Sequence, residues 1–223
     1  MRVRTPVTLR PSRVVTVLPV GDFGFTVARH VRERTPNVNV LEAPLHESIE
    51  LLLHDPSAIA ILIAWRPTVA VAEALDRRSH ATGTPFLSLT LNDTAMLMGP
   101  IVIPGMSSCW RCWASREMRA DVFPGISQCK LDYYAAHPSE GPSGYLHSLA
   151  LLGAAQLCSA LENINTSAAT PGEVIRTDLF ARRIEPSRAI GFDNCDRCGL
   201  KRPIKSRSLG DLRHALRALW PTV

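Results

Sequence analysis

The sequence predicts an α/β protein, with a Rossmann-like and mostly parallel sheet, an antiparallel hairpin extension and a structural zinc site of four cysteines. In the first part of the chain, apolar β-branched runs alternate with segments of helical composition, as is typical of parallel strands joined by helical crossovers. The alternation stops at residues 95–103, where two short apolar segments flank Gly99-Pro100. Beyond that point, two Cys-x-x-Cys pairs stand far apart in the chain.

The composition is that of an ordinary globular protein. Its 223 residues are 46% hydrophobic, which is enough for a substantial core. The longest apolar run, residues 58–65, is far shorter than a membrane span, and no signal peptide is visible at the N-terminus. Four of the six cysteines have the spacing of metal ligands rather than of a secreted disulfide framework. We therefore expect a cytoplasmic protein that does not associate with membranes.

The formal net charge of +5 comes from scattered arginines and one basic run, residues 201–207. Proteins that bind nucleic acids usually interleave such a run with aromatic residues or carry it on a recognition helix, and neither pattern is found here. A nucleic-acid partner is therefore not expected. The run is interpreted as a solvated loop, with docking of an acidic partner as the alternative.

The chain is expected to divide into four segments. Residues 1–12 form a flexible N-terminus, and residues 13–98 form the Rossmann-like half. Residues 99–200 contain the hairpin, a mobile loop, a long helix and the cysteine pairs, and residues 201–223 carry the basic run and an amphipathic helix.

The first strand and helix are expected over residues 13–20 and 25–34, joined by a turn at Gly21 and Gly24. In a dinucleotide-binding loop of the form Gly-x-Gly-x-x-Gly, these would be the second and third glycines. Pro19 occupies the first position, and proline is rigid and has no N–H to offer a phosphate. The loop is therefore expected to keep its packing role but to be degenerate as a phosphate site.

The following segments continue the alternation. We expect strands over residues 38–43, 58–64 and 85–91, and helices over 46–53 and from 67 or 68 to 78. Residues 95–98 and 100–103 are then expected to pair as the hairpin that leads to the first cysteine pair.

The second half is less regular. Residues 113–144 are polar and interrupted by Pro and Gly, so we expect an extended or partly mobile loop, in which Cys129 is most simply incidental. A long apolar helix is expected over 145–161, followed by paired strands over 173–178 and 181–184. Paired carboxylates, a histidine-based triad and a Glu-x-x-His ligand set are all missing from the sequence.

The two cysteine pairs are the strongest chemical signal. Two cysteines separated by two residues can hold two corners of a tetrahedral zinc ion from one tight turn. One such pair alone could be a redox centre, but Cys109, Cys112, Cys195 and Cys198 together make a closed shell with no open position for water. Such a shell is structural rather than catalytic. Two disulfides or unpaired thiols remain the alternatives.

Several motifs together resemble the ThiF/MoeB superfamily of activating enzymes. They are the run Gly-Pro-Ile-Val-Ile-Pro-Gly from Gly99 to Gly105, the first cysteine pair, the following Arg116, the long apolar helix, and the second cysteine pair with its Gly199. More narrowly, the chain is similar to the ThiF-like partner proteins of cyclodehydratases, which install azolines in ribosomally synthesised peptides. The resemblance covers roughly residues 13–199.

Members of this superfamily that adenylate a carboxylate bind ATP through a glycine loop, an acidic ribose ligand after the second strand, an Asn–Arg-Gln element and a magnesium-binding aspartate after the third strand. Here Pro19 begins the loop, no Asn–Arg-Gln element follows Glu42, and residues 64–66 (Ala-Trp-Arg) stand where the aspartate is expected. Gly21 and Gly24 remain as parts of a degenerate loop, and Glu42 as a candidate ribose ligand. The expected cofactor is therefore structural zinc, without ATP or magnesium.

The resemblance implies a non-catalytic, homodimeric scaffold that supports a YcaO-type cyclodehydratase or a related tailoring enzyme, because such partners are commonly silent while the YcaO-type enzyme uses ATP. Many of them carry an N-terminal leader-binding segment. Only residues 1–12 precede the first expected strand, so we expect that segment to be absent and the precursor peptide to be recognised through another protein or surface.

Two alternatives stay open. The first is a divergent ATP-dependent adenylating enzyme that uses Cys129 as acyl acceptor, since members with ligation activity carry such a cysteine in the loop after the first pair. The second is a zinc-stabilised module that binds an acidic partner.

Overall fold

The computed structural model describes residues 14–54, 59–92, 95–142 and 144–199. The strands are β1 (Val15–Val20), β2 (Val38–Val40), β3 (Ile59–Ala64), β4 (Phe86–Asn92), β5 (Ala95–Met98), β6 (Glu173–Asp178) and β7 (Arg183–Arg188). The helices are α1 (Gly21–Arg34), α2 (Leu45–His54), α3 (Val69–Thr82), α4 (Trp110–Ala120), α5 (Pro124–Ala136) and α6 (His147–Asn165). The N-terminal segment 1–12 and the basic run and helix expected over 201–223 lie outside the described residues.

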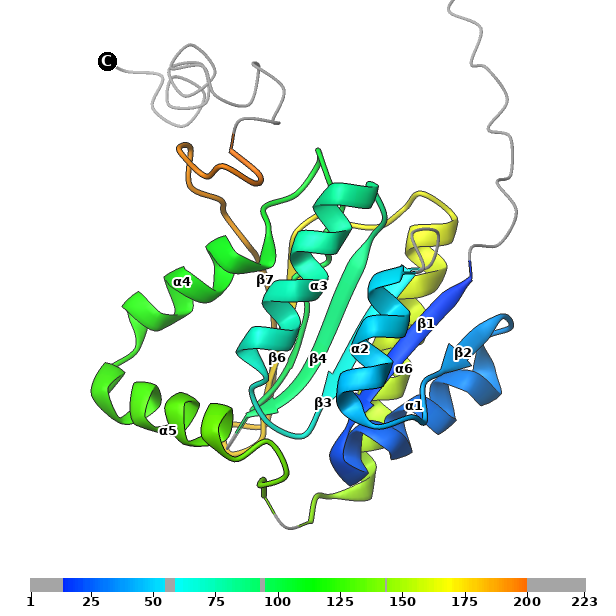
Figure 1. Cartoon of the computed structure of the whole chain (residues 1–223), viewed down its shortest axis with the longest axis horizontal. Helices are drawn as coiled ribbons and strands as arrows, with labels where there is room; N and C mark the ends of the chain where they lie inside the picture. Colours follow the sequence, from blue (N-terminus) through cyan, green and yellow to red (C-terminus); the bar gives the residue numbers. More distant parts are fainter. Residues whose placement is uncertain (1–13, 55–58, 93–94, 143, 200–223) are drawn as a thin grey trace, which may run out of the picture.

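The strands form one seven-stranded sheet in the order β2-β1-β3-β4-β5-β6-β7 (Figure 1). The first four strands of this order are parallel, and β5, β6 and β7 continue the sheet in antiparallel fashion. The expected α/β fold with an antiparallel extension is thus confirmed. Because β2 and β3 lie on opposite sides of β1, the switch point of the sheet falls at the carboxyl ends of β1 and β3.

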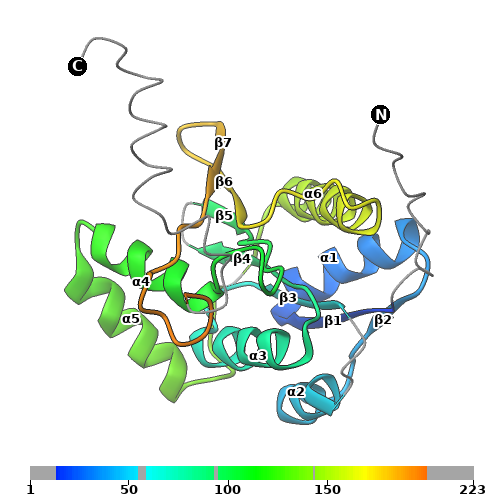
Figure 2. The same ribbon diagram turned by 90° about the horizontal axis from the view of Figure 1, so that it is seen from above.

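Helices cover both faces of the parallel part (Figure 2). α1 and α6 lie on one face, and α2 and α3 on the other. Along β3, Ile59, Ile61 and Ile63 pack into the core under α1 and α6, whereas the even-numbered residues pack into the core under α2 and α3. This alternation on two buried faces explains why β3 reads as a continuous apolar run in the sequence.

The antiparallel hairpin forms between other segments than those expected. β5 pairs with β4 on one side and with β6 on the other. The expected pairing of residues 95–98 with 100–103 is wrong, because the chain continues alongside β4 after Gly99, where Val102 makes an isolated bridge to Phe86. Pro100, which has no N–H to donate, interrupts the ladder between the two stretches.

The segment after the first cysteine pair is helical, and the expected extended loop over 113–144 is wrong for most of its length. α4 begins inside the cysteine pair, and α5 follows after a short connection. Pro124 lies in the first turn of α5, where a missing N–H costs nothing, so this breaker starts a helix instead of marking a loop. No described side chain of α5 is buried, and the helix lies at the periphery of the molecule (Figures 1 and 2).

The remaining elements form close to where their periodicity predicts them. α6 continues beyond residue 161 to Asn165, and β7 begins at Arg183 instead of 181. Within the described residues, no helix combines the length and the apolar character that a membrane span requires.

Candidate metal centre and the carboxyl edge of the sheet

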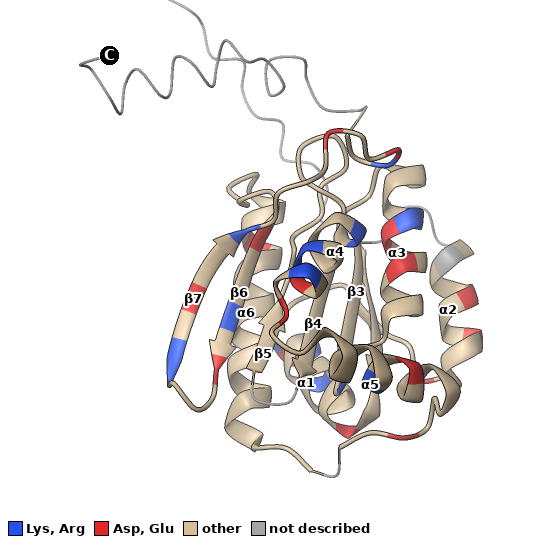
Figure 3. Cartoon of the chain, turned by 90° about the vertical axis from the view of Figure 1, so that its left-hand side faces the viewer, with Lys and Arg blue, Asp and Glu red and all other residues tan. Residues whose placement is uncertain are grey.

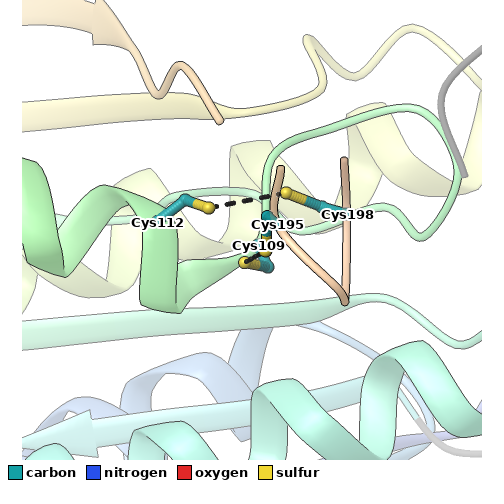
Figure 4. Close-up of side chains that lie close together, drawn as sticks. All are labelled: Cys109, Cys112, Cys195 and Cys198. Carbon is teal, nitrogen blue, oxygen red and sulfur yellow. Dashed lines mark hydrogen bonds between the residues drawn. The ribbon is translucent and has the colours of Figure 1, made fainter. Parts of the chain in front are cut away.

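The four cysteines predicted as metal ligands meet at one place, although the two pairs are 86 residues apart in the chain (Figure 4). Cys109 precedes α4, and Cys112 lies in its first turn. Cys195 and Cys198 come from a tight turn after β7, closed by a hydrogen bond from the N–H of Gly199 to the carbonyl of Cys195. All four side chains are buried.

The sulfur positions suit a tetrahedral metal ion. The Sγ atoms of Cys109 and Cys195 are 3.7 Å apart, and those of Cys112 and Cys198 are 3.6 Å apart. All four lie within 4.8 Å of one another. Zinc–sulfur bonds of about 2.3 Å would place tetrahedral sulfurs about 3.8 Å apart, whereas a disulfide needs about 2.05 Å. The cluster could therefore hold a metal ion, and its cysteines are free thiols.

The protonation of these thiols depends on their surroundings. Burial raises the pKa of Cys112 to about 11. A hydrogen bond with Cys198, together with burial, raises the pKa of Cys109. Burial acts in the same direction on Cys195, but hydrogen bonds from the Cys198 backbone and from Arg111 outweigh it and lower the Cys195 pKa. Metal binding must displace protons from the thiols whose pKa is raised, so a lower pH weakens metal binding.

Groups that donate hydrogen bonds to sulfur surround the cluster. Arg111, inside the first pair, donates to Sγ of Cys195 at 3.5 Å and forms an ion pair with Asp196 of the second pair. The backbone N–H of Phe192 donates to Sγ of Cys112 at 3.4 Å. Because such donors favour the thiolate form, they stabilise the state of sulfur that binds metal.

A buried carboxylate on α3 holds both cysteine pairs. Arg197, inside the second pair, donates to Glu73 at 2.6 and 3.2 Å and to Asp76 at 2.5 Å. The Asp76 side chain is fully buried and also accepts the N–H of Trp110 at 3.0 Å, at the start of α4. A carboxylate at this position satisfies the free N–H groups of a helix N-terminus. Figure 3 shows α3, which carries acidic and basic residues, next to α4.

An indole closes the carboxyl ends of β1 and β3. β1 ends at Val20, whose carbonyl accepts a hydrogen bond from the backbone N–H of Trp65 at 3.2 Å. The Trp65 side chain stands between two glycines: an added Cβ would lie 2.3 Å from it at Gly21 and 2.5 Å from it at Gly141. Gly21 is the first residue of α1. The indole is thus at the helix N-terminus where phosphates bind in open α/β sheets.

The expected turn at Gly21 and Gly24 is part of α1, which begins at Gly21 and not at residue 25. Gly21 has a φ of 73°, which favours glycine, and the indole leaves no room for a side chain. At Gly24, a Cβ would lie 2.6 Å from the carbonyl oxygen of Ile63, so this glycine lets α1 approach β3 closely. Pro19 lies within β1, beside Ile63.

The two other candidate residues lie in different surroundings. The Glu42 side chain is 70% exposed and forms an ion pair with Arg32 at 3.6 Å. Cys129 is exposed on α5. It lines neither the cavity of about 700 Å³ between α3, α4, α5 and the sheet nor the cavity of about 250 Å³ at the sheet edge.

The sequence did not identify Asp76 and Arg197 as supports of the cysteine cluster, or Trp65 as the side chain at the carboxyl ends of β1 and β3. Asp76 gave one usable signal, since it follows Leu75 and lies one turn after Ala72 on the buried face of α3, where a carboxylate needs partners. Trp65 gave none, because only the folded chain brings it against Gly21.

No protein-family model matches the chain, and no curated protein sequence matches it. Solved structures nevertheless share its fold. The heterocyclase TruD has a TM-score of 0.60 over 84% of this chain at 15% identity. The E. coli microcin synthetase McbBCD complex has a TM-score of 0.61 over 86% of this chain at 10% identity. E. coli MccB with succinimide has a TM-score of 0.58 over 84% at 12% identity.

The matched chains are longer than this one. The match covers 28% of TruD, 71% of the chain from McbBCD and 67% of MccB. The chain therefore spans about a quarter of the length of the heterocyclase that it matches. At these identities the likeness establishes the fold, which this chain shares with components of heterocyclases and of microcin synthetase.

Proposed function

We propose that this chain is a non-catalytic, ThiF-like scaffold that supports a YcaO-type cyclodehydratase or a related tailoring enzyme in the biosynthesis of ribosomally synthesised modified peptides. The observation that carries the proposal is the contact of Trp65 with Gly21, which fills the space at the N-terminus of α1 while the cysteine cluster is intact. The fold shared with TruD and with the McbBCD complex supports the same class of function.

Structural zinc is the proposed occupant of the cysteine cluster, with Cys109, Cys112, Cys195 and Cys198 as its ligands. Four buried thiols at tetrahedral spacing leave no open position for water or substrate. Zinc with four thiolates carries a net charge of about −2, which Arg111 beside the Cys195 sulfur partly offsets. Free thiols persist in a reducing compartment, so a cytoplasmic location belongs to the same proposal.

The absence of ATP binding is also part of the proposal. Phosphates at a helix N-terminus need accessible backbone N–H groups, and the Trp65 indole stands at this place. Magnesium requires oxygen ligands, usually carboxylates, and the residue that follows Trp65 is Arg66. The chain would therefore contribute surface and stability, and the partner enzyme would contribute ATP chemistry.

Homodimer formation and peptide recognition complete the proposal. The chain would form a homodimer, and the precursor peptide would reach the enzyme through another protein or another surface. Sedimentation of the purified chain tests the first of these statements directly, because a monomer at micromolar concentration would remove it.

Reconstitution tests the function. ATP-dependent loss of water from the precursor peptide, followed by mass spectrometry, is expected to be faster when this chain is added to a YcaO-type enzyme from the same organism. The chain alone is expected to show no ATP binding by calorimetry and no pyrophosphate exchange. Exchange by the chain alone with a peptide carboxylate would overturn the proposal. A thioester that then forms on the chain with release of AMP, and that Cys129→Ser does not form although its exchange is unchanged, would favour the adenylating alternative.

A further inference from the structure

Arg66 is a buried cation directly after β3. The residue is 4% exposed, and its guanidinium lies over the Tyr134 ring, 4.7 Å from the centroid. It donates to two backbone carbonyls, at 3.3 Å to Pro67 and at 2.8 Å to Pro138. Burial lowers the pKa of this guanidinium, which shows that the surroundings disfavour its charge.

The charge of Arg66 has no carboxylate partner within the described part of the chain. The ion pairs of the described residues do not include Arg66, and its Nε atom is buried without a hydrogen-bond partner. An arginine offers five N–H donors, and the two carbonyls use only part of this capacity. A buried, unpaired cation is costly to fold, so a bound anion would relieve the cost.

Arg66 also lines a cavity of about 250 Å³. Its lining combines polar groups with apolar side chains, which include Trp65, Leu91, Tyr145, Leu149 and Leu179. Among the described residues that line it, Arg66 is the only charged one. The cavity is partly open and therefore offers one positive charge beside apolar side chains.

From this arrangement we propose that the Arg66 cavity binds a carboxylate next to an apolar group, as in the last residue of a peptide or in a small organic acid. One guanidinium matches the charge and the planar shape of one carboxylate. A nucleotide triphosphate would require more positive charge or a metal ion, and more volume. The proposal goes beyond the scaffold function, since it assigns a ligand to this chain itself.

Calorimetry on the purified full chain tests the proposal with N-acetyl-leucine as probe and N-acetyl-leucine amide as its neutral counterpart. We expect the carboxylate probe to bind and the amide probe not to bind. Arg66→Met is expected to weaken binding of the carboxylate probe by about 10- to 100-fold while keeping or raising the melting temperature, because an apolar side chain replaces a buried charge.

Arg116→Met is the matched control. Arg116 also donates to a backbone carbonyl and lies over an aromatic ring, but it does not line the cavity. Equal binding of both probes, no binding of either, tighter binding of inorganic phosphate, or full affinity in Arg66→Met would each overturn the proposal. A leucine-terminated tetrapeptide that binds more tightly than N-acetyl-leucine would assign the site to peptide ends, and the reverse order would assign it to small acids.

No partner enzyme enters these measurements. Failure of the carboxylate proposal therefore leaves the scaffold function untouched, and failure of the reconstitution leaves the carboxylate proposal untouched.

Discussion

The cysteine cluster and the carboxyl edge of the parallel strands differ in what can occupy them, an added ion in the first and a side chain of the protein in the second. The four buried thiols, with a cationic neighbour, form a coordination shell that could hold a metal ion. At the edge, the chain itself occupies the N-terminus of α1, because the Trp65 indole stands against Gly21. The cluster lies on α4 and the turn after β7, and the edge on β1, β3 and α1. The same α/β fold therefore combines a cluster that could hold a metal ion with a helix N-terminus that a side chain of the chain itself occupies.

Removal of one cysteine thiol is expected to have the largest effect, on both metal content and stability. In Cys195→Ser, metal content should fall from one ion per chain to almost none. The free energy of unfolding should fall by several kcal/mol, because zinc binding, worth about 10–16 kcal/mol in zinc-finger peptides, is coupled to folding. Metal analysis and denaturant unfolding check both effects. Cys129→Ser, which changes an exposed thiol, is the matched control, and full metal content in Cys195→Ser would contradict the cluster assignment.

Loss of the buried carboxylate on α3 should come next. Asp76→Ala removes the acceptor for Arg197 and for the N-terminus of α4, and leaves Arg197 with fewer partners. A loss of about 3–5 kcal/mol is expected, since one member of a buried pair is removed. Asp196→Ala removes a carboxylate that is 77% exposed and should cost less than about 1 kcal/mol. Equal losses in the two variants would show that Asp76 does not link the cysteine pairs.

The sheet edge can be tested by a double-mutant cycle. Gly21→Ala should destabilise the chain because its Cβ would overlap the indole, and Trp65→Ala should relieve part of that cost. We expect a coupling of about 1–3 kcal/mol from denaturant unfolding. Gly83→Ala is the control, because Gly83 has the same φ of 73° with no atom close to an added Cβ. If the losses of unfolding free energy for Gly21→Ala and Trp65→Ala add up in the double variant, the indole is not the reason why position 21 requires glycine.

The smallest effect is expected at Glu42. Its exposed ion pair with Arg32 should contribute little, so Glu42→Gln should change stability by less than about 0.5 kcal/mol. Calorimetric titration with ATP and magnesium should be silent for the wild-type chain and for the variant. Binding by the wild type that the variant loses would identify Glu42 as a ribose ligand and would reopen the edge as a nucleotide site.

Periodicity was sufficient for the parallel half of the fold. The apolar run of β3 and the amphipathic pattern of the crossover helices depend on local sequence, so their order and approximate bounds could be predicted. α4 and α5 could not be predicted, because proline and glycine in this segment are compatible with helix starts as well as with loops. α5 also has no buried face, so its apolar residues do not recur at helical spacing. The true partner of β5 also depends on which strand lies beside it in the sheet.

The cysteine cluster was predictable because paired cysteines at fixed spacing carry their chemistry in the sequence. Its supports were not, since Arg197 and Asp76 are 121 residues apart and neither belongs to a motif. The contact of Trp65 with Gly21 and Gly141 likewise needs three distant segments to meet. The sequence shows that the aspartate expected after the third strand is missing, but it does not show that the Trp65 side chain occupies the neighbouring helix N-terminus.

The separation of the two cysteine pairs also sets an order of events during synthesis. Cys109 and Cys195 are 86 residues apart, so with a ribosome adding roughly 5–20 residues per second, the first pair emerges about 4–17 s before the second. Until Cys198 has emerged, the nascent chain offers too few thiolates for a closed shell. Metal capture would then mark completion of the α/β unit, and a product truncated before Cys195 would contain β1 to β7 but could not complete the cluster.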